Sequence, residues 1–268
     1  MHVSSRFTTR SALVNVMSAA IEKAARGLIR DFGEVEQLQV SRKGLGDFVS
    51  TADRKSEEIL ITELRKARPK FGFITEESGE IPGEDETQRW IVDPLDGTSN
   101  FLHGIPHFAI TVALQMGDEI IAGVTYDPIK DEMFWSEKGR GTFLNQRRIR
   151  VSGRRVFDEA LIGVGAPYGH HGDPVLFQDR LARVMPHAAG VRRMGAASLD
   201  LAYVACGRFD IFFEEPMHIW DYAAGILMVQ EAGGVVSDIN GQKNVFKTNS
   251  VAAGNADMHA TLMKKLAA

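Results

Sequence analysis

The sequence predicts a mixed fold, with an α+β first half and an α/β second half, and the spacing of its apolar residues leads to this prediction. In the first half, two amphipathic helical stretches precede strand-like runs that short turns join, as in an antiparallel sheet. In the second half, strand-like and helical stretches alternate, which is typical of an α/β layer. The pattern changes near residues 150–158, so we expect one domain over residues 1–268, with halves at about 1–150 and 151–268.

The elements of the first half are predicted from helical periodicity, caps and turns. The first helix covers Ser11 to Phe32, with an apolar stripe along one face and Gly33 at the position of a C-terminal cap. A glycine-rich loop, Lys43 to Asp47, precedes a second helix from about Asp53 to Arg68, which Pro69 stops. Strands are expected at residues 71–75, 90–92, 108–115, 120–126 and 133–136.

The elements of the second half follow from shorter apolar runs. Strands are expected at residues 160–165, 210–214 and 251–253. Helices are expected at residues 174–185, 198–206, 221–232 and from residue 257 onward. Gly233-Gly234 closes the most apolar of these helices.

Composition excludes several classes of function. Of 268 residues, 44% are hydrophobic and the net charge is −4, so no basic field exists to attract nucleic acid and we expect no direct nucleic-acid binding. Cys206 is the single cysteine, which excludes an intrachain disulfide and a cysteine zinc cluster and favours a reducing compartment. The polar segment Met1 to Arg10 lacks the apolar core of a signal peptide, and no stretch approaches the ~18–20 apolar residues of a membrane span. We therefore expect a cytoplasmic protein that does not bind membranes.

The strongest candidate site follows the strand at residues 90–92, where Asp93 and Asp96 lie three residues apart. Pro94 and Gly97 permit a tight turn that can direct both carboxylates and the Leu95 carbonyl to one point. Such oxygen ligands suit Mg²⁺. An ordinary Asp-Gly turn explains this segment equally well when it is taken alone.

Two further acidic positions favour the metal site. Glu76 and Glu77 end another apolar strand, and Asp221 begins an apolar helix, although a solvated loop and a helix cap are the simpler explanations of each. Together with Asp93 and Asp96, these acids all lie at the ends of elements. Two Mg²⁺ ions bridged by Asp93 could activate a water molecule and stabilise the leaving oxygen of a phosphate ester.

With these acidic motifs, the chain resembles the inositol monophosphatase family, which belongs to the superfamily of lithium-sensitive, magnesium-dependent phosphatases. The resemblance covers roughly residues 11–260, in the family's order and spacing. It is carried by Glu76-Glu77-Ser78, Asp93-Pro94-Leu95-Asp96-Gly97-Thr98, Trp220-Asp221, Ala223-Ala224-Gly225 and Glu231-Ala232-Gly233-Gly234. It implies a layered α/β/α/β/α sandwich, a homodimer, and Mg²⁺-dependent hydrolysis of a phosphate monoester of a small polyol.

The resemblance also implies a set of metal ligands, for two or three Mg²⁺ per site. Glu76, Asp93 and the Leu95 carbonyl would hold the first ion, and Asp93, Asp96 and Asp221 the second. Lys43 and Asp47 would lie on a loop over the site and assist a weaker third ion.

The remaining roles concern water, phosphate and alcohol. Thr98 and Glu76 would orient the attacking water, with Asp53 behind Thr98, although Asp53 is also a natural cap for its helix. Glu214 would accept hydrogen bonds from ring hydroxyl groups, or it is simply exposed. Phosphate would bind to the N–H groups of Gly97 and Thr98. The substrate-binding residues implied are Asp96, Gly97, Thr98, Gly195, Ala196, Ala197, Glu214 and Asp221.

The residues after Thr98 limit the set of candidate substrates. Ser99-Asn100-Phe101 is similar to inositol monophosphatases, so myo-inositol monophosphate is the expected substrate, whereas the nucleotide and histidinol enzymes usually carry a lysine directly after the threonine. Near Gly165-Ala166-Pro167 the sequence departs from family members that place a serine against the substrate. Alternatives are fructose 1,6-bisphosphate, histidinol phosphate and 3′-phosphoadenosine 5′-phosphate. A different class of role, in transcription and ribosomal RNA synthesis, is known in some bacterial relatives.

Overall fold

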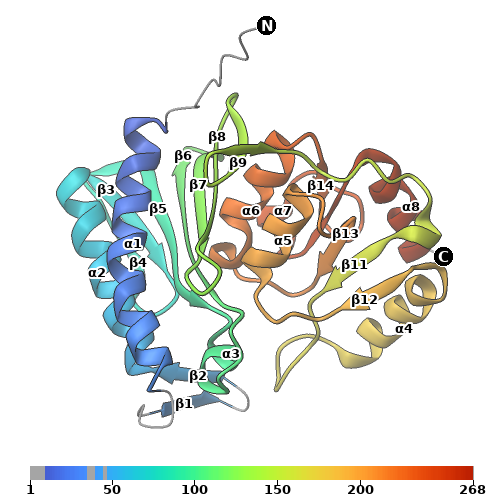
Figure 1. Cartoon of the computed structure of the whole chain (residues 1–268), viewed down its shortest axis with the longest axis horizontal. Coiled ribbons are helices and arrows are strands. Elements are labelled where there is room, and N and C mark those ends of the chain that lie inside the picture. Colours follow the sequence, from blue (N-terminus) through green and yellow to red (C-terminus); the bar gives the residue numbers. More distant parts are fainter. Residues whose placement is uncertain (1–9, 35–39, 45–46, 268) are drawn as a thin grey trace, which may run out of the picture.

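Two large β-sheets alternate with helices in the computed structural model, which describes residues 10–34, 40–44 and 47–267 (Figure 1). Helices α1 and α2 cover one face of the eight-stranded sheet, and α5 and α6 lie between its other face and the five-stranded sheet. Helices α4 and α8 cover the outer face of the smaller sheet. This layering confirms the expected α/β/α/β/α sandwich.

The first helical layer consists of α1 (Ala12–Phe32) and α2 (Thr51–Ala67). The apolar stripe that predicted α1 is its buried face, because Met17, Ile21 and Leu28 are at most 1% exposed. Ser11 caps this helix by accepting a hydrogen bond from the Val14 N–H at 3.2 Å. The periodicity of the sequence therefore placed this helix and its inward face correctly.

The larger sheet has the strand order β10-β9-β8-β7-β6-β5-β3-β4. Its only parallel pair among the described strands is β3 with β5. The strands are β3 (Phe71–Thr75), β4 (Gly79–Ile81), β5 (Asp85–Asp96), β6 (Ala109–Met116), β7 (Glu119–Asp127), β8 (Glu132–Glu137), β9 (Gly141–Leu144) and β10 (Arg147–Ile149).

The central layer is formed by α5 (Ala197–Ala205) and α6 (Ile219–Glu231). Alternate residues of β5 face opposite layers: Trp90 and Val92 pack with α1 and α2, and Ile91 packs with α5 and α6. Helix α6 lies so close to the sheet that a Cβ on Gly123 would be 2.8 Å from the Ala224 Cα. Helix α6 is thereby held against the sheet that carries Asp93 and Asp96.

The smaller sheet has the order β12-β11-β13-β15-β14, in which β12, β11 and β13 are parallel. Its strands are β11 (Leu161–Val164), β12 (Gly190–Arg192), β13 (Ile211–Glu214), β14 (Val235–Ser237) and β15 (Val251–Gly254). The outer helices are α4 (Pro174–Val184) and α8 (Ala256–Ala267), and α3 (Thr98–Leu102) and α7 (Val245–Thr248) are short. No helix in the described ranges is long and apolar enough to cross a bilayer.

Two local expectations were wrong. Lys43 and Asp47 belong to paired antiparallel strands, β1 (Val40–Gly44) and β2 (Asp47–Ser50), rather than to a loop, while Leu45 and Gly46 lie outside the described residues. Helix α2 begins at Thr51, so Asp53 lies in its first turn and is not its cap. Strand pairing overrides the local glycine signal in the first case, because pairing partners are not encoded within a short window.

Candidate active site

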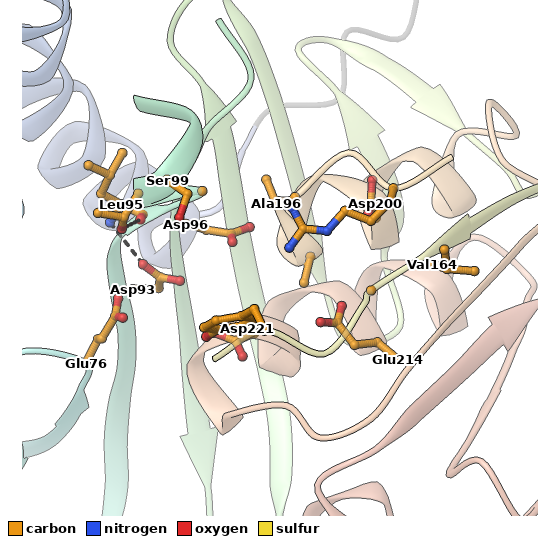
Figure 2. Close-up of a pocket in the computed structure, with 17 residues that line it drawn as sticks. Glu76, Asp93, Leu95, Asp96, Ser99, Val164, Ala196, Asp200, Glu214 and Asp221 are labelled. Carbon is orange, nitrogen blue, oxygen red and sulfur yellow. Dashed lines mark hydrogen bonds between the residues drawn. The ribbon is translucent and has the colours of Figure 1, made fainter. Parts of the chain in front are cut away.

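Glu76 and Asp93 come together because β3 and β5 are parallel. The register pairs Thr75 with Val92, so Glu76, the residue after β3, lies at the same level as Asp93, which is still paired with Thr111 of β6. Figure 2 shows the two carboxylates on the same side of the cavity. A feature of the sheet topology therefore joins two acids that lie far apart in the sequence.

The end of β5 and the turn at Gly97 are held by side chains of the same segment and by Ser56 of α2. The Asp93 Oδ1 accepts a hydrogen bond from the Leu95 N–H at 2.9 Å, and the Thr98 hydroxyl donates to the Leu95 carbonyl at 2.9 Å. Ser56 of α2 donates to the Pro94 carbonyl at 2.9 Å. Gly97 has φ 91°, which is the left-handed region that glycine adopts without strain. The expected turn is therefore present at Gly97, whereas Asp93 to Asp96, which were expected to follow the strand, form the irregular last part of β5.

The turn is connected to α5 across the central layer. The Asp96 Oδ2 accepts hydrogen bonds from the Ser198 N–H at 2.8 Å and from the Ser198 hydroxyl at 2.5 Å. Asn100, which is 7% exposed, donates to the Met194 carbonyl at 2.9 Å. The segment Gly195 to Ala197 is thus held beside the acidic turn.

Asp221 and Glu214 complete the site from the second half of the chain. Asp221 lies in the first turn of α6, where its Oδ2 accepts a hydrogen bond from the His218 N–H at 2.7 Å. Its expected helix-capping role is confirmed, and its other carboxylate oxygen can still act as a ligand. Glu214 is the last residue of β13.

These elements enclose a cavity of about 190 Å³. Every site residue expected from the sequence lines it, except Asp53, which is buried in α2 and 2% exposed, and Lys43 and Asp47, whose side chains lie outside the described part of the structure. Figure 2 shows Glu76, Asp93, Asp96 and Asp221 towards one end and Glu214 and Asp200 towards the other. The lining residues are Glu76, Asp93, Leu95, Asp96, Gly97, Thr98, Ser99, Val164, Gly165, Tyr168, Arg193, Gly195, Ala196, Ala197, Asp200, Glu214 and Asp221.

The carboxyl groups of the cavity are costly to ionise. Burial, followed by repulsion from Glu76 and Asp96, raises the pKa of Asp93 well above its usual range. Burial raises the pKa of Asp96 to about 6, although the hydrogen bonds from Ser198 oppose this shift. Burial, and then repulsion from Asp96, raises the pKa of Asp221 well above its usual range. Arg193 is the one cationic side chain among the lining residues that the structure describes.

The donor set fits a hard divalent cation in its chemistry. The carboxylates of Glu76, Asp93, Asp96 and Asp221, with the Leu95 carbonyl, offer oxygen ligands only, which suit Mg²⁺ better than Zn²⁺. In the described part of the chain, no three Asp, Glu, His or Cys side chains are close enough to hold one ion as they stand. Ion binding would therefore need rotation of carboxylates that now accept hydrogen bonds from the protein. A cation would also offset the mutual repulsion of these acids.

Several residues at the site were not anticipated from the sequence. Ser198 fixes Asp96, and Arg193 brings positive charge to the cavity, but neither carries a local signal in the sequence. Asp200 does carry one, because an aspartate inside the apolar run Leu199 to Ala205 is unusual unless it is functional or paired. The side chains of Lys43 and Asp47 are outside the described part of the structure, so their role in a third metal site stays a prediction.

Asp200 yields a testable prediction about stability. It is 1% exposed, its Oδ1 has no hydrogen-bond partner among the described residues, and burial followed by repulsion from Glu214 raises its pKa well above the usual range. A raised carboxyl pKa means that the folded protein loses stability as pH rises. We expect Asp200→Asn to raise Tm by about 3 °C or more at pH 8, and by less at pH 5. The exposed Asp118→Asn is the matched control in thermal unfolding, and a lower Tm for Asp200→Asn would contradict the prediction.

Comparison with known proteins now identifies the family. A model of the inositol monophosphatase family matches residues 8–268. The chain belongs to the inositol monophosphatase family. It is 54% identical over 258 residues to an inositol-1-monophosphatase of Mesorhizobium japonicum, a match that covers 95% of this chain and 96% of that protein. The chain is therefore a phosphatase of this family.

Other relatives of this phosphatase carry a different name. It is 39% identical over 243 residues to the Nus factor SuhB of Escherichia coli, covering 91% of each protein. The crystal structure of the extragenic suppressor protein suhB from Bartonella henselae matches with a TM-score of 0.93 and 54% identity, covering 96% of this chain and 98% of that one. An inositol monophosphatase from Thermotoga maritima matches with a TM-score of 0.86 and 30% identity, covering 96% and 97%. These solved structures share the layered fold.

Proposed function

We propose that this phosphatase hydrolyses the phosphate monoester of a small polyol, with myo-inositol monophosphate as its substrate, and that it requires Mg²⁺. The observation that carries the proposal is the cavity, which combines the carboxylates of β3, β5 and α6 with Glu214 and the start of α5. An anionic ester can enter so acidic a site only with cations present. The name of the Mesorhizobium relative supports the choice of inositol.

At the phosphate end, each residue has a proposed task. Glu76, Asp93, Asp96, Asp221 and the Leu95 carbonyl would hold Mg²⁺. When bound, Mg²⁺ supplies charge that lowers the pKa of a water molecule and stabilises the leaving oxygen.

The water and the phosphate would be held by the turn after β5. The Thr98 hydroxyl, which lies beside the Leu95 carbonyl, would orient the attacking water together with Glu76. The N–H groups of Gly97 and Thr98 would bind the phosphate oxygens. Asp53 would act from behind the cavity, one helical turn before Ser56, which contacts the Pro94 carbonyl.

At the other end, Glu214 and the segment Gly195 to Ala197 would bind the alcohol. A polyol offers hydroxyl donors, which a carboxylate can accept. Asn100 holds this segment through the Met194 carbonyl, so the alcohol end keeps its position relative to the acidic turn. The alcohol end therefore lies on the second half of the chain, whereas the phosphate end combines the first half with Asp221 of the second.

The deciding experiment is phosphate release from myo-inositol 1-phosphate with millimolar Mg²⁺, measured beside fructose 1,6-bisphosphate, 3′-phosphoadenosine 5′-phosphate and histidinol phosphate. We expect inositol 1-phosphate to have the highest kcat/KM, and EDTA to abolish its hydrolysis. Preference for another ester would keep the chemistry and overturn the substrate. Activity that survives EDTA would overturn the metal requirement.

A second candidate function is a role in transcription. It is favoured by the relatives named Nus factor SuhB in Escherichia coli and Pseudomonas aeruginosa, at 39% and 40% identity. Such a role would use a surface rather than the cavity. A variant without phosphatase activity that still supports ribosomal RNA synthesis in cells lacking the wild-type gene would establish it, and failure of that variant would tie the phenotype to catalysis.

Two further family properties are part of the proposal. We expect the protein to be a homodimer, which light scattering after size-exclusion chromatography measures directly. We also expect Li⁺ to inhibit it, because the resemblance places it among lithium-sensitive phosphatases.

A further inference from the structure

Gly165 and Glu214 are neighbours on adjacent parallel strands. The register pairs Val164 of β11 with Phe213 of β13, so the next residues, Gly165 and Glu214, lie at the same level where the strands end. The Gly165 N–H donates to the Phe213 carbonyl at 3.3 Å, which extends the pairing by one step. Both residues line the cavity described above.

The Glu214 carboxyl group occupies the space in which a side chain at position 165 would stand. A Cβ on Gly165 would lie 1.7 Å from the Glu214 Cδ and 2.1 Å from each of its carboxylate oxygens. Gly165 is not among the glycines with positive φ, whereas Gly97 and Gly195 are. A side chain at position 165 would therefore displace the Glu214 carboxyl group, and the constraint on this position is one of space rather than of backbone conformation.

In the part of the chain that the structure describes, the Glu214 carboxyl group is surrounded by charged groups but is not held by a hydrogen bond. Burial, and then repulsion from Asp96, raises the pKa of Glu214 to about 8, while Arg193 opposes the shift. Among the described residues these effects act through space, and no hydrogen bond contributes to them. The carboxyl group also forms part of the wall of a second cavity of about 250 Å³, which Gly165 lines as well. A displacement of Glu214 would therefore change the shape of the alcohol end.

We propose that Gly165 determines the alcohol specificity of this phosphatase, because its missing side chain leaves the space in which the Glu214 carboxyl group receives the hydroxyl groups of a polyol. Residue 165 acts through Glu214 and is thus a positioning residue. The proposal rests on the proposed function for its substrate class. Near Gly165 the sequence departs from family members that place a serine against the substrate, and the proposal gives this departure a physical consequence, namely space for the Glu214 carboxyl group.

The first test compares two substrates in Gly165→Ala. We expect KM for myo-inositol 1-phosphate to rise about tenfold or more, which corresponds to the loss of a hydrogen bond, with a much smaller change in kcat. The loss of kcat/KM should be at least about fivefold larger for inositol 1-phosphate than for p-nitrophenyl phosphate, which has no polyol. Gly153→Ala is the matched control, because a Cβ there meets nothing within 4 Å. Equal losses for both substrates would overturn the proposal.

The second test is a double-mutant cycle with Glu214→Ala. Because the three atoms nearest to the added Cβ all belong to Glu214, Gly165→Ala should have little further effect on KM or Tm in the Glu214→Ala background. If Gly165→Ala alone folds poorly, the double variant should recover its Tm. Additive effects, or no recovery, would overturn the proposal. If the wild-type protein does not hydrolyse inositol 1-phosphate, the proposed function fails, and the Tm cycle still decides whether residue 165 positions Glu214.

Discussion

Replacement of Asp93 by asparagine should lower kcat for inositol 1-phosphate by at least about a thousandfold, because the proposed bridging ligand loses its charge and metal stabilisation of the transition state is worth several kcal/mol. The fold should be retained. An asparagine Oδ1 can accept the same hydrogen bond from the Leu95 N–H, and the substitution removes a buried carboxylate whose pKa is raised. Phosphate release and thermal unfolding measure the two effects separately.

Asp118→Asn is the matched control for this variant, since it makes the same chemical change on an exposed turn. We expect it to keep wild-type activity. A rate for Asp93→Asn within tenfold of wild type would contradict the assignment of Asp93 to the metal site. The inactive variant also tests preparations for contaminating phosphatases.

Without Mg²⁺, stability should fall as pH rises from about 4 to about 8, by on the order of 5 °C in Tm or more. The pKa of Asp96 is about 6 and that of Glu214 about 8 in the folded protein, both above the ordinary carboxyl values of 3.8 and 4.5. The folded state therefore binds more protons than the unfolded state in this range, so its stability decreases with rising pH. The titratable and charged groups that face each other here are Glu76, Asp93, Asp96, Arg193, Asp200, Glu214 and Asp221.

Saturating Mg²⁺ should reverse this loss. At 100 times its Kd, a ligand of the folded state adds about 2.7 kcal/mol, or about 5 to 10 °C for a chain of this size. The gain should be larger at pH 8 than at pH 5, because protons compete with Mg²⁺ for the carboxylates.

NaCl at equal ionic strength controls for general screening, and EDTA should remove the Mg²⁺ effect. The Asp93→Asn variant should show a reduced gain. No shift in Tm with Mg²⁺, or stability that rises with pH in its absence, would contradict the metal site.

The sequence by itself determined the elements and residues whose signals are local. Helical periodicity alone predicts the apolar stripe of α1. The two-residue period of a strand alone predicts that Trp90 and Ile91 face opposite layers. The hydrogen bonds within the segment Asp93 to Thr98 join residues at most three apart, so the chemistry of this segment could be predicted before any fold was known. Glu76 and Asp221 were found in the same way, at the ends of apolar elements, whereas Glu214 was assigned by the family resemblance.

Only the tertiary structure decided which distant residues share the cavity. Asp96 accepts a hydrogen bond from Ser198, which is 102 positions away in the sequence. Strand register places Glu214 beside Gly165, and Arg193 lines the same cavity. The pairing of β1 with β2 and the order of both sheets were likewise invisible in short windows. The physical reason is that periodicity and turn chemistry report on neighbours in the chain, whereas burial, register and repulsion between carboxylates depend on groups that only folding brings into contact.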